Sequence, residues 1–234
     1  NNTSNQNGAV IKNNVSPLEI HDSRFANNYS QNGGNIYNDQ SGSSIIITGS
    51  TFTNNDGNYY DGSVIRTDSD LSITNCVFML NTGNVLGGYQ SNSTADITIL
   101  NSIIWNNTII GNSFNNINVS VSYSCIEGSY SGTGNTNLLP QFCNPFEYPL
   151  TLSSSSPLIG VGWFNENIGG LDTSCEIPTS TFYISSNGSI NGLGTETMPL
   201  LSIQKAIDGI SPSDTVLIAP GVYEENIDII DKNI

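Results

Sequence analysis

The hydrophobic positions between residues 18 and 107 recur in four copies of one pattern. Each copy has two apolar residues separated by one position, then a small residue, a bulky apolar residue and an asparagine. The bulky position is occupied by Phe25, Phe52, Phe78 and Ile104, and the asparagines are Asn28, Asn55, Asn81 and Asn107. The regular interval between copies predicts a solenoid, because one repeat can bury its apolar face only against its neighbours.

The pattern within each copy predicts strands. The paired apolar residues alternate with period two and are rich in β-branched side chains, at 18–20, 45–47, 71–73 and 97–99. Clusters of glycine and asparagine at 31–34 and 55–58 can adopt the positive φ angles that tight corners require. The sequence therefore predicts an all-β solenoid with coils of about 26 residues, within the range of repeat lengths that solenoids use.

Two further segments extend the repeat region. A shortened fifth copy follows the fourth, at Val119, Val121, Ser124 and Ile126. Residues 1–17 form a partial coil, in which 8–11 aligns with 34–37 if the same period holds. The repeat region is therefore expected to begin in the middle of a coil.

The interior of such a solenoid is predictable from the repeat. Equivalent residues stack at the inter-strand spacing of about 4.8 Å, so the bulky positions are expected to form one continuous interior stack. The recurring asparagines are expected to form a buried ladder at a corner, in which each amide bonds to the next coil. The small position holds Ser23, Ser50, Cys76 and Ser102, so Cys76 is expected to be a buried free thiol.

These repeats resemble the right-handed parallel β-helix of the pectate-lyase-like superfamily. Within it, the nearest resemblance is to the asparagine-rich, phenylalanine-containing repeats of secreted adhesin-like proteins on microbial surfaces. The resemblance implies a right-handed coil, which the spacing alone does not give. It also implies an extracellular location and raises polysaccharide cleavage as an activity to be weighed.

The chain divides into four segments. Residues 1–137 are the coils, 138–172 a closing segment, 173–181 a linker, and 182–234 a cap with the first coil of a further solenoid. The closing segment resembles that of bacterial secreted β-helix proteins, with a Pro-x-Phe step at 140–142 and a Ser-Pro run at 156–160.

Residues 182–234 resemble the N-terminal cap of secreted right-handed β-helices. A strand and turn at 182–188 precede an amphipathic helix near 200–210, with Pro199 in its first turn. A strand with a Pro-Gly-x-Tyr turn at 214–223 follows, and then a strand at 227–230. The expected capping residues are Leu200, Ile203, Ile207, Ile210, Val216, Ile218 and Tyr223.

A cap that follows the coils leaves the first coil open, and three interpretations remain. The chain can be a piece of a longer array of β-helix domains. The cap can complete the open coil of a neighbouring molecule in a head-to-tail contact that propagates into a filament. It can also return to its own first coil, although a linker of this length reaches at most about 30 Å and the coils span roughly 25–30 Å.

The composition limits the classes of binding partner and the cellular compartment that we expect for this chain. Five Lys and Arg residues oppose 20 Asp and Glu residues, and the net charge is −15. Such a chain is not expected to bind nucleic acid or an anionic membrane surface, and no apolar run is long enough to span a bilayer. Low lysine with abundant Asn, Ser and Thr favours an extracellular protein. Candidate glycosylation sites are Asn2, Asn14, Asn28, Asn92, Asn106, Asn118 and Asn187.

No constellation of catalytic residues stands out. Asp56, Asp61, Asp68 and Asp70 surround Arg66 and could supply oxygen ligands to calcium, but their spacing matches no calcium loop and favours turn residues. The single histidine, His21, is expected to be an exposed structural residue, so a nucleophile–histidine pair has little support. No catalytic residue, metal or cofactor is predicted.

The cysteines and aromatic residues leave alternatives open. The pair Cys143–Cys175 is the favoured disulfide, with Cys125–Cys143 as its rival, and a bridge would fit an oxidising compartment. Tyr59, Tyr60, Tyr89 and Trp105 fall in or near corners and are candidate exposed aromatics for glycan or protein binding.

The function that the sequence favours is a non-catalytic structural or adhesive solenoid that assembles end to end or with neighbouring β-helix domains. The alternatives are a polysaccharide lyase or hydrolase and a carbohydrate-binding module, because β-helices host all three.

Overall fold

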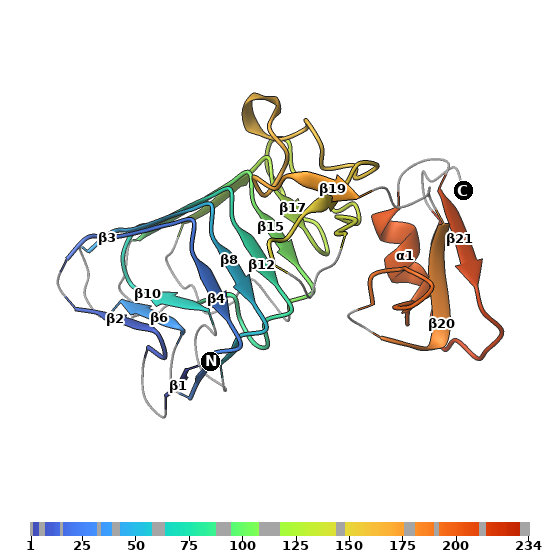
Figure 1. The fold of residues 1–234 in the computed structure, drawn as a ribbon, viewed down its shortest axis with the longest axis horizontal. Coiled ribbons are helices and arrows are strands. Elements are labelled where there is room, and N and C mark those ends of the chain that lie inside the picture. The colour runs from blue at the N-terminus through green and yellow to red at the C-terminus, as the bar shows by residue number, and fades with distance from the viewer. Residues whose placement is uncertain are drawn as a thin grey trace. The chain divides into compact units, whose positions relative to one another are not determined.

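The structure is a computed structural model with two compact units, Asn1–Thr136 with Gly162–Gly170, and Asn137–Val161 with Leu171–Ile234. The described residues are 2–4, 8–14, 16–31, 34–38, 43–57, 64–87, 95–107, 118–143, 148–175, 181–189, 192–210 and 214–229. The first unit is a parallel β-solenoid of about five turns (Figure 1). We call it the solenoid unit.

Two five-stranded sheets form the solenoid's main walls, and every strand pair in them is parallel. The strands of the first wall are β3 (Leu18–His21), β7 (Ile45–Thr48), β11 (Leu71–Thr74), β14 (Asp96–Leu100) and β16 (Asn118–Ser122). Those of the second wall are β4 (Arg24–Ala26), β8 (Thr51–Thr53), β12 (Val77–Met79), β15 (Ile103–Trp105) and β17 (Cys125–Ile126). In Figure 1 the second-wall strands lie side by side.

Two smaller parallel sheets complete the coils. One contains β2 (Ile11–Asn13), β6 (Ile36–Asn38), β10 (Ile65–Thr67) and β13 (Leu86–Gly87). The other contains β1 (Thr3–Ser4), β5 (Tyr29–Ser30) and β9 (Asp56–Gly57). From β1 to β12 the chain visits the four sheets in turn and advances one strand in each sheet per coil.

The strand registers reproduce the predicted period within the walls. In the first wall Leu18 lies opposite Ile45, Ile45 opposite Leu71, and Leu71 opposite Ile97. The predicted alignment of 8–11 with 34–37 is wrong for the partial first coil, because Ile11 lies opposite Ile36 and not Tyr37. The backbone N–H groups of Val10 and Ile11 both donate to the Asn35 carbonyl, which accommodates the shift in register.

Corners with positive φ separate the two walls from each other and from the next sheet. The corner between the walls holds Asp22, Gly49, Asn75, Asn101 and Tyr123, all with positive φ. The corner after the second wall holds Asn27, Asn54, Leu80, Asn106 and Gly128, again all positive. Asparagine, aspartate and glycine dominate both rows because they tolerate this conformation best.

The core lies between the walls and is built from apolar side chains. Alternate wall residues point inward, including Ile47, Ile73, Ile99 and the buried stack at Phe52 and Phe78. The two free cysteines, Cys76 and Cys125, are also buried. Burial raises the pKa of Cys76 to about 12 and raises the pKa of Cys125 as well.

The second unit contains two small parallel sheets and one helix in its described residues. In its first part β18 (Leu152–Ser153) pairs with β19 (Thr173–Cys175). In its second part, which we call the cap, β20 (Thr181–Ser189) pairs with β21 (Thr215–Ile218), and α1 (Ile203–Gly209) lies between them in the sequence. The unit boundary also assigns 162–170 to the solenoid unit.

Three details of the cap differ from the expectation. The helix begins at Ile203 and not at Pro199, because the Ser202 side chain caps it by accepting from the Lys205 N–H at 3.1 Å. The strand β20 continues to Ser189 without a turn at 185–188. Residues 227–229 form no strand, since the backbone of Asp228 bonds to the Gln204 side chain.

In the described part of the chain, no helix is both long enough and apolar enough to cross a membrane.

Candidate assembly surfaces

The asparagine ladder runs through the corner after the second wall. Asn28, Asn55 and Asn81 each donate their backbone N–H and their side-chain amide to the Oδ1 atom one coil further on, at 2.9–3.1 Å. The side-chain amides of Asn55, Asn81 and Asn107 also reach phenylalanine carbonyls of the preceding coil, at 2.8–2.9 Å. The ladder thus binds each coil to both neighbours.

Sequence analysis missed the member of this ladder in the partial coil. The backbone N–H and side-chain amide of Asn2 donate to Asn28 Oδ1 at 3.0 and 3.1 Å. Asn2 precedes Asn28 by one period of the repeat, so the spacing could have found it. Its position shows that the ladder continues to the first coil.

A second polar row runs along the small position between the walls. The backbone N–H groups of Ser23, Cys76 and Ser102 donate to the Oγ atom of the serine one coil further on, at 3.0–3.1 Å. Both polar rows therefore point in one direction, with the donor in the earlier coil and the side-chain acceptor in the later coil.

The phenylalanine stack fills the space between these rows. The rings of Phe25 and Phe52, and of Phe52 and Phe78, are stacked with centroids 4.7 Å apart and interplanar angles of 9° and 2°. Ile104 lies in register with Phe78 and continues the stack. The solenoid interior is thus uniform from coil to coil, and its special features lie at its surfaces.

The first coil presents an edge. In the described sheets β2, β3 and β4 each have a strand neighbour on one side alone. The inward residues Ile11 and Leu18 of this coil are half-buried, whereas their partners in the next coil, Ile36 and Ile45, are 0% and 1% exposed. We call the exposed side of β2, β3 and β4 the open edge.

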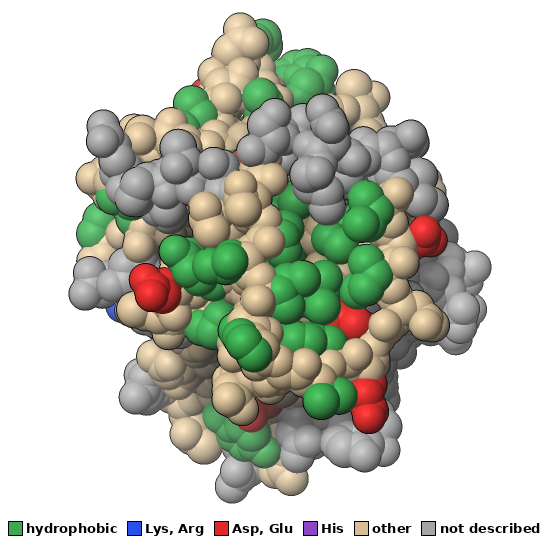
Figure 2. All heavy atoms as spheres, turned by 90° about the vertical axis from the view of Figure 1, so that its right-hand side faces the viewer, with side chains coloured by type: hydrophobic (Ala, Val, Ile, Leu, Met, Phe, Trp, Pro, Cys, Tyr) green, Lys and Arg blue, Asp and Glu red, His purple; other side chains and the backbone are tan. Residues whose placement is uncertain are grey.

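The cap presents an apolar surface. Five large apolar side chains of β21 and the following segment are 41–81% exposed, namely Leu217, Ile218, Val222, Ile227 and Ile229. We call this set the cap face. Figure 2 turns the right-hand side of Figure 1 toward the viewer and shows hydrophobic side chains gathered on that side, with acidic side chains among and around them. A monomeric surface rarely leaves so many large apolar residues together without a binding role.

The predicted capping residues divide between the cap's interior and this surface. Leu200, Ile207 and Ile210 are buried, and Ile203 is half-buried at the start of α1. Val216 is half-buried, Ile218 belongs to the cap face, and the Tyr223 hydroxyl donates to the Ala219 carbonyl at 2.8 Å. Val216 and Ile218 are in register with the buried Phe182 and Ile184 and share their side of the sheet, whereas Leu217 points to the opposite side.

A carboxylate holds the segment after β21 against the helix. The Glu225 carboxylate accepts hydrogen bonds from the backbone N–H groups of Ile203 and Gln204 and from the Ser202 hydroxyl, at 2.8–3.0 Å. The Gln204 side chain also pairs with the backbone of Asp228. These contacts fix the segment that carries Ile227 and Ile229 and so help to define the cap face.

The hydrogen bonds of the Glu225 carboxylate predict that the stability of the cap depends on pH. Partial burial opposes ionisation of Glu225, but the three hydrogen bonds outweigh it and hold the pKa of this carboxyl below its usual value. Its stabilisation is therefore present above the unfolded-state pKa of about 4.3 and is lost as the pH falls through the lower folded-state pKa. The protection of the 203–209 amides, measured as the exchange rate relative to the intrinsic rate at the same pH, should fall on acidification. The Glu225→Gln variant should show fast exchange already at neutral pH, and Glu224→Gln, which alters an exposed neighbour, should not.

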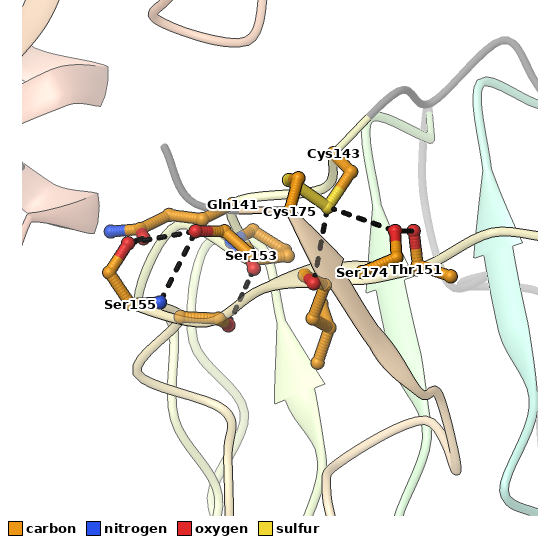
Figure 3. The surroundings of a disulfide bond; sticks show 10 residues. Gln141, Cys143, Thr151, Ser153, Ser155, Ser174 and Cys175 are labelled. Atoms are coloured by element: carbon orange, nitrogen blue, oxygen red, sulfur yellow. Dashed lines mark hydrogen bonds between the residues drawn. A yellow bond between two sulfur atoms is a disulfide. The ribbon is translucent and has the colours of Figure 1, made fainter. Parts of the chain in front are cut away.

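A disulfide bond cross-links the second unit. Cys143 and Cys175 are joined, with a Cα–Cα distance of 5.8 Å, and the rival Cys125 is a buried free thiol. Figure 3 shows the bridge beside Thr151 and Ser174, whose hydroxyls lie 2.6 Å apart. The bridge therefore ties the chain after Phe142 to β19 and confirms the favoured pairing.

The aromatic residues proposed for binding are not where they were expected. Trp105 is 3% exposed and lies in β15 in register with buried Met79, so it is a core residue and not a binding residue. Tyr59, Tyr60 and Tyr89 lie outside the described residues.

A different aromatic pair is exposed on the solenoid unit. Trp163 and Phe164 are 40% and 79% exposed, in the short 3-10 helix η1 (Trp163–Asn165). Asn101 anchors this loop, because its Oδ1 accepts from the Trp163 N–H at 3.2 Å and its amide donates to the Asn167 carbonyl at 3.1 Å. Phe164 has a φ of 55°, an outlier for a bulky residue. The loop thus holds an aromatic side chain outward at a conformational cost.

The acidic residues do not form a metal site in the described part of the chain, where no group of three or more His, Cys, Asp or Glu side chains is close enough to hold an ion. Asp56 and Asp70 are exposed and Asp68 is buried, while Asp61 lies outside the described residues. Asp70 accepts from the Asp96 N–H at 2.9 Å, which is a structural role. The exposed His21 lies beside Thr48 and Glu19.

The candidate glycosylation sites differ in exposure. Asn28 and Asn106 are buried, and the Asn28 amide is bonded within the ladder, so the expectation of glycans at these two positions is wrong for the folded chain. Four sites are exposed, namely Asn2, Asn14, Asn118 and Asn187. Asn92 lies outside the described residues.

The fold and surfaces define a parallel β-solenoid joined to a cap with an exposed apolar face. Comparison with protein-family models, with curated proteins and with solved structures finds no match to this chain.

Proposed function

We propose that this chain is a non-catalytic structural or adhesive solenoid of the extracellular space or cell surface, and that its cap covers the first coil of a solenoid. The cap face carries the proposal, because five large apolar side chains exposed beside the edge of a parallel strand are suited to strand addition. That solenoid can lie further along a longer chain or in a neighbouring molecule.

Two other features support a structural role outside the cell. The polar rows and the phenylalanine stack fill the interior with mutually bonded or stacked side chains, which stabilise the coils. The disulfide fits an oxidising compartment.

The test combines location and activity. Antibodies against the chain should label the surface of intact source cells. Incubation with polygalacturonate and calcium, and with neutral polysaccharides, should release no unsaturated or reducing-end products. Product release by the purified chain would replace the structural role with an enzymatic one.

Binding of a neutral glycan is a second candidate function, and the exposed pair Trp163–Phe164 favours it. Aromatic rings pack against the C–H faces of sugars, and the exposed side chains of Asn165 and Glu166 beside them can bond hydroxyl groups. The acidic chain disfavours anionic glycans.

This second candidate has its own test. Retention on immobilised neutral polysaccharides should be lost in Trp163→Ala/Phe164→Ala and kept in Tyr148→Ala, which removes an exposed aromatic elsewhere. Equal retention of the wild type and both variants would exclude this site.

A further inference from the structure

The loop at residues 163–167 of the solenoid unit, which we call the aromatic loop, presents aromatic rings and a carboxylate together. We propose that its preferred ligand is a glycan of amino sugars whose amino groups are free and protonated. The Trp163 and Phe164 rings would pack on the C–H face of such a sugar, and the Glu166 carboxylate would bind its ammonium group. This inference rests on the second candidate function, glycan binding at this loop, and it adds the functional group that the preferred glycan carries.

One asparagine side chain holds both the aromatic and the acidic part of the loop. Asn101 Oδ1 accepts from the Trp163 N–H at 3.2 Å, and the Asn101 amide donates to Glu166 Oε2 at 3.5 Å. The side-chain amide of Asn75, one coil earlier, donates to the same carboxylate oxygen at 3.3 Å. The Trp163 backbone and the Glu166 carboxylate therefore lie at opposite atoms of one amide group, which fixes their separation.

The backbone of the aromatic loop is also held in place. The Glu166 N–H donates to the Trp163 carbonyl at 3.2 Å, and the Gly169 N–H donates to the Asn101 carbonyl at 2.8 Å. A Cβ atom at Gly169 would lie 2.7 Å from Ile103 Cδ1, so the chain after the loop packs directly on the second wall. A ligand can therefore bind without first ordering this loop, which lowers the entropic cost of binding.

The rings of the loop are arranged at an angle and face solvent. Tyr123, in the corner between the walls, packs against Trp163 with the ring centroids 5.0 Å apart and an interplanar angle of 68°. Phe164 packs against the same tryptophan at 4.8 Å and 62°. Phe164 is exposed in spite of its positive φ, and unfavourable backbone conformations of this kind cluster at ligand sites. The loop is therefore built to present its rings.

The charge of Glu166 selects the ammonium group. The carboxylate is exposed, and within the described residues both of its hydrogen bonds go to Oε2, which leaves Oε1 available to a ligand. No Lys or Arg side chain in that part of the chain forms an ion pair with it. The net charge of −15 also raises the local concentration of cationic ligands. A protonated amine is therefore a better partner for this carboxylate than a hydroxyl group.

An amino sugar is the ligand that uses the rings and the carboxylate at once. Its ammonium group and its C–H face belong to one ring, so both can contact the loop in a single pose. A lysine-rich protein would supply the ammonium group without a flat C–H face. An N-acetylated sugar would supply the face without the charge.

The experiment is isothermal titration calorimetry of the full chain with a β-1,4-linked glucosamine oligomer and with its fully N-acetylated counterpart. The pH is mildly acidic, so that the sugar amines are protonated and a carboxylate is ionised. The wild type should bind the free-amine oligomer about tenfold or more tightly than the N-acetylated one. Glu166→Gln should remove this preference and leave binding of the N-acetylated oligomer unchanged. Trp163→Ala/Phe164→Ala should lose both.

A matched control separates the local carboxylate from the total charge. Glu224→Gln makes the same change in net charge at an exposed position of the cap and should bind both oligomers as the wild type does. The preference should also persist at moderate salt, because salt screens the attraction between distant charges more than a direct contact. Equal loss of affinity in Glu166→Gln and Glu224→Gln would assign the preference to net charge and overturn the inference.

The remaining outcomes separate this inference from the function on which it rests. Equal affinity of the wild type for both oligomers, with loss of both in the aromatic double variant, overturns the preference for amines and leaves glycan binding standing. Binding of a lysine-rich peptide as tightly as the free-amine oligomer overturns the assignment to a sugar. A folded chain that binds neither oligomer overturns the inference, and retention on neutral polysaccharides then decides the second candidate function separately.

Discussion

Replacing Asn81 by alanine should destabilise the solenoid unit by about 3–5 kcal/mol, because this substitution leaves buried polar groups in two neighbouring coils without hydrogen-bond partners. The side chain accepts from the Asn55 backbone and side chain and donates to Phe52 and Asn107, all within 2.9–3.0 Å. Removing it leaves the Asn55 amide and the Phe52 carbonyl buried without these partners. Alanine also opens a cavity that its own methyl group does not fill.

Urea unfolding followed by tryptophan fluorescence measures this effect. Both tryptophans of the chain, Trp105 and Trp163, belong to the solenoid unit, so the signal reports on that unit. The midpoint should fall with the slope unchanged. The control Asn118→Ala removes an exposed asparagine and should change stability by less than about 0.5 kcal/mol. Similar midpoints for both variants would contradict a ladder that stabilises the fold.

Replacing Phe52 by alanine should be at least as damaging, at about 4–5 kcal/mol. Its ring is fully buried and stacks on Phe25 and Phe78 at 4.7 Å on both sides. The cavity would lie between two rings whose strands are fixed by parallel pairing, so neighbouring coils cannot collapse into it. Phe52→Leu keeps most of the volume and should cost less than about 1.5 kcal/mol.

The same substitution elsewhere provides the control. Phe164→Ala removes an exposed ring from a left-handed position, so it should leave stability within about 0.5 kcal/mol of the wild type. Thermal unfolding monitored by circular dichroism compares the three variants. A loss for Phe52→Ala no greater than that for Phe164→Ala would show that the stack contributes little to the fold.

The interior of the solenoid was predictable because the residues of each stacked row recur in the sequence at a nearly constant interval. Phe52 and Asn81 occupy rows that recur once per coil, and stacking follows from parallel strands. The period could not predict the left-handed corner at Leu80, because a leucine there shows no preference for positive φ. The surrounding ladder imposes that conformation.

The surfaces were harder to predict because they depend on contacts between segments without a repeat. The exposure of Phe164 follows from the anchoring of its loop on Asn101, which is distant from Trp163 in the sequence. Glu225 reaches back to the start of α1, and nothing in the sequence marks it as a cap. The amphipathic helix was visible in the spacing of the apolar residues near 200–210, yet which side of the cap stays uncovered was not.

The one-directional polar rows make the solenoid modular in length. Each hydrogen bond of the polar rows connects a coil only to its immediate neighbours. Excising residues 50–75 would therefore join Gly49 to Cys76 and restore the register of each row. Such a solenoid would be shorter by one stacking distance, 4.7 Å at the phenylalanine rings, with its first coil unaltered. Duplication of residues 50–75 would lengthen the solenoid by one coil. The number of coils therefore sets the length of the solenoid.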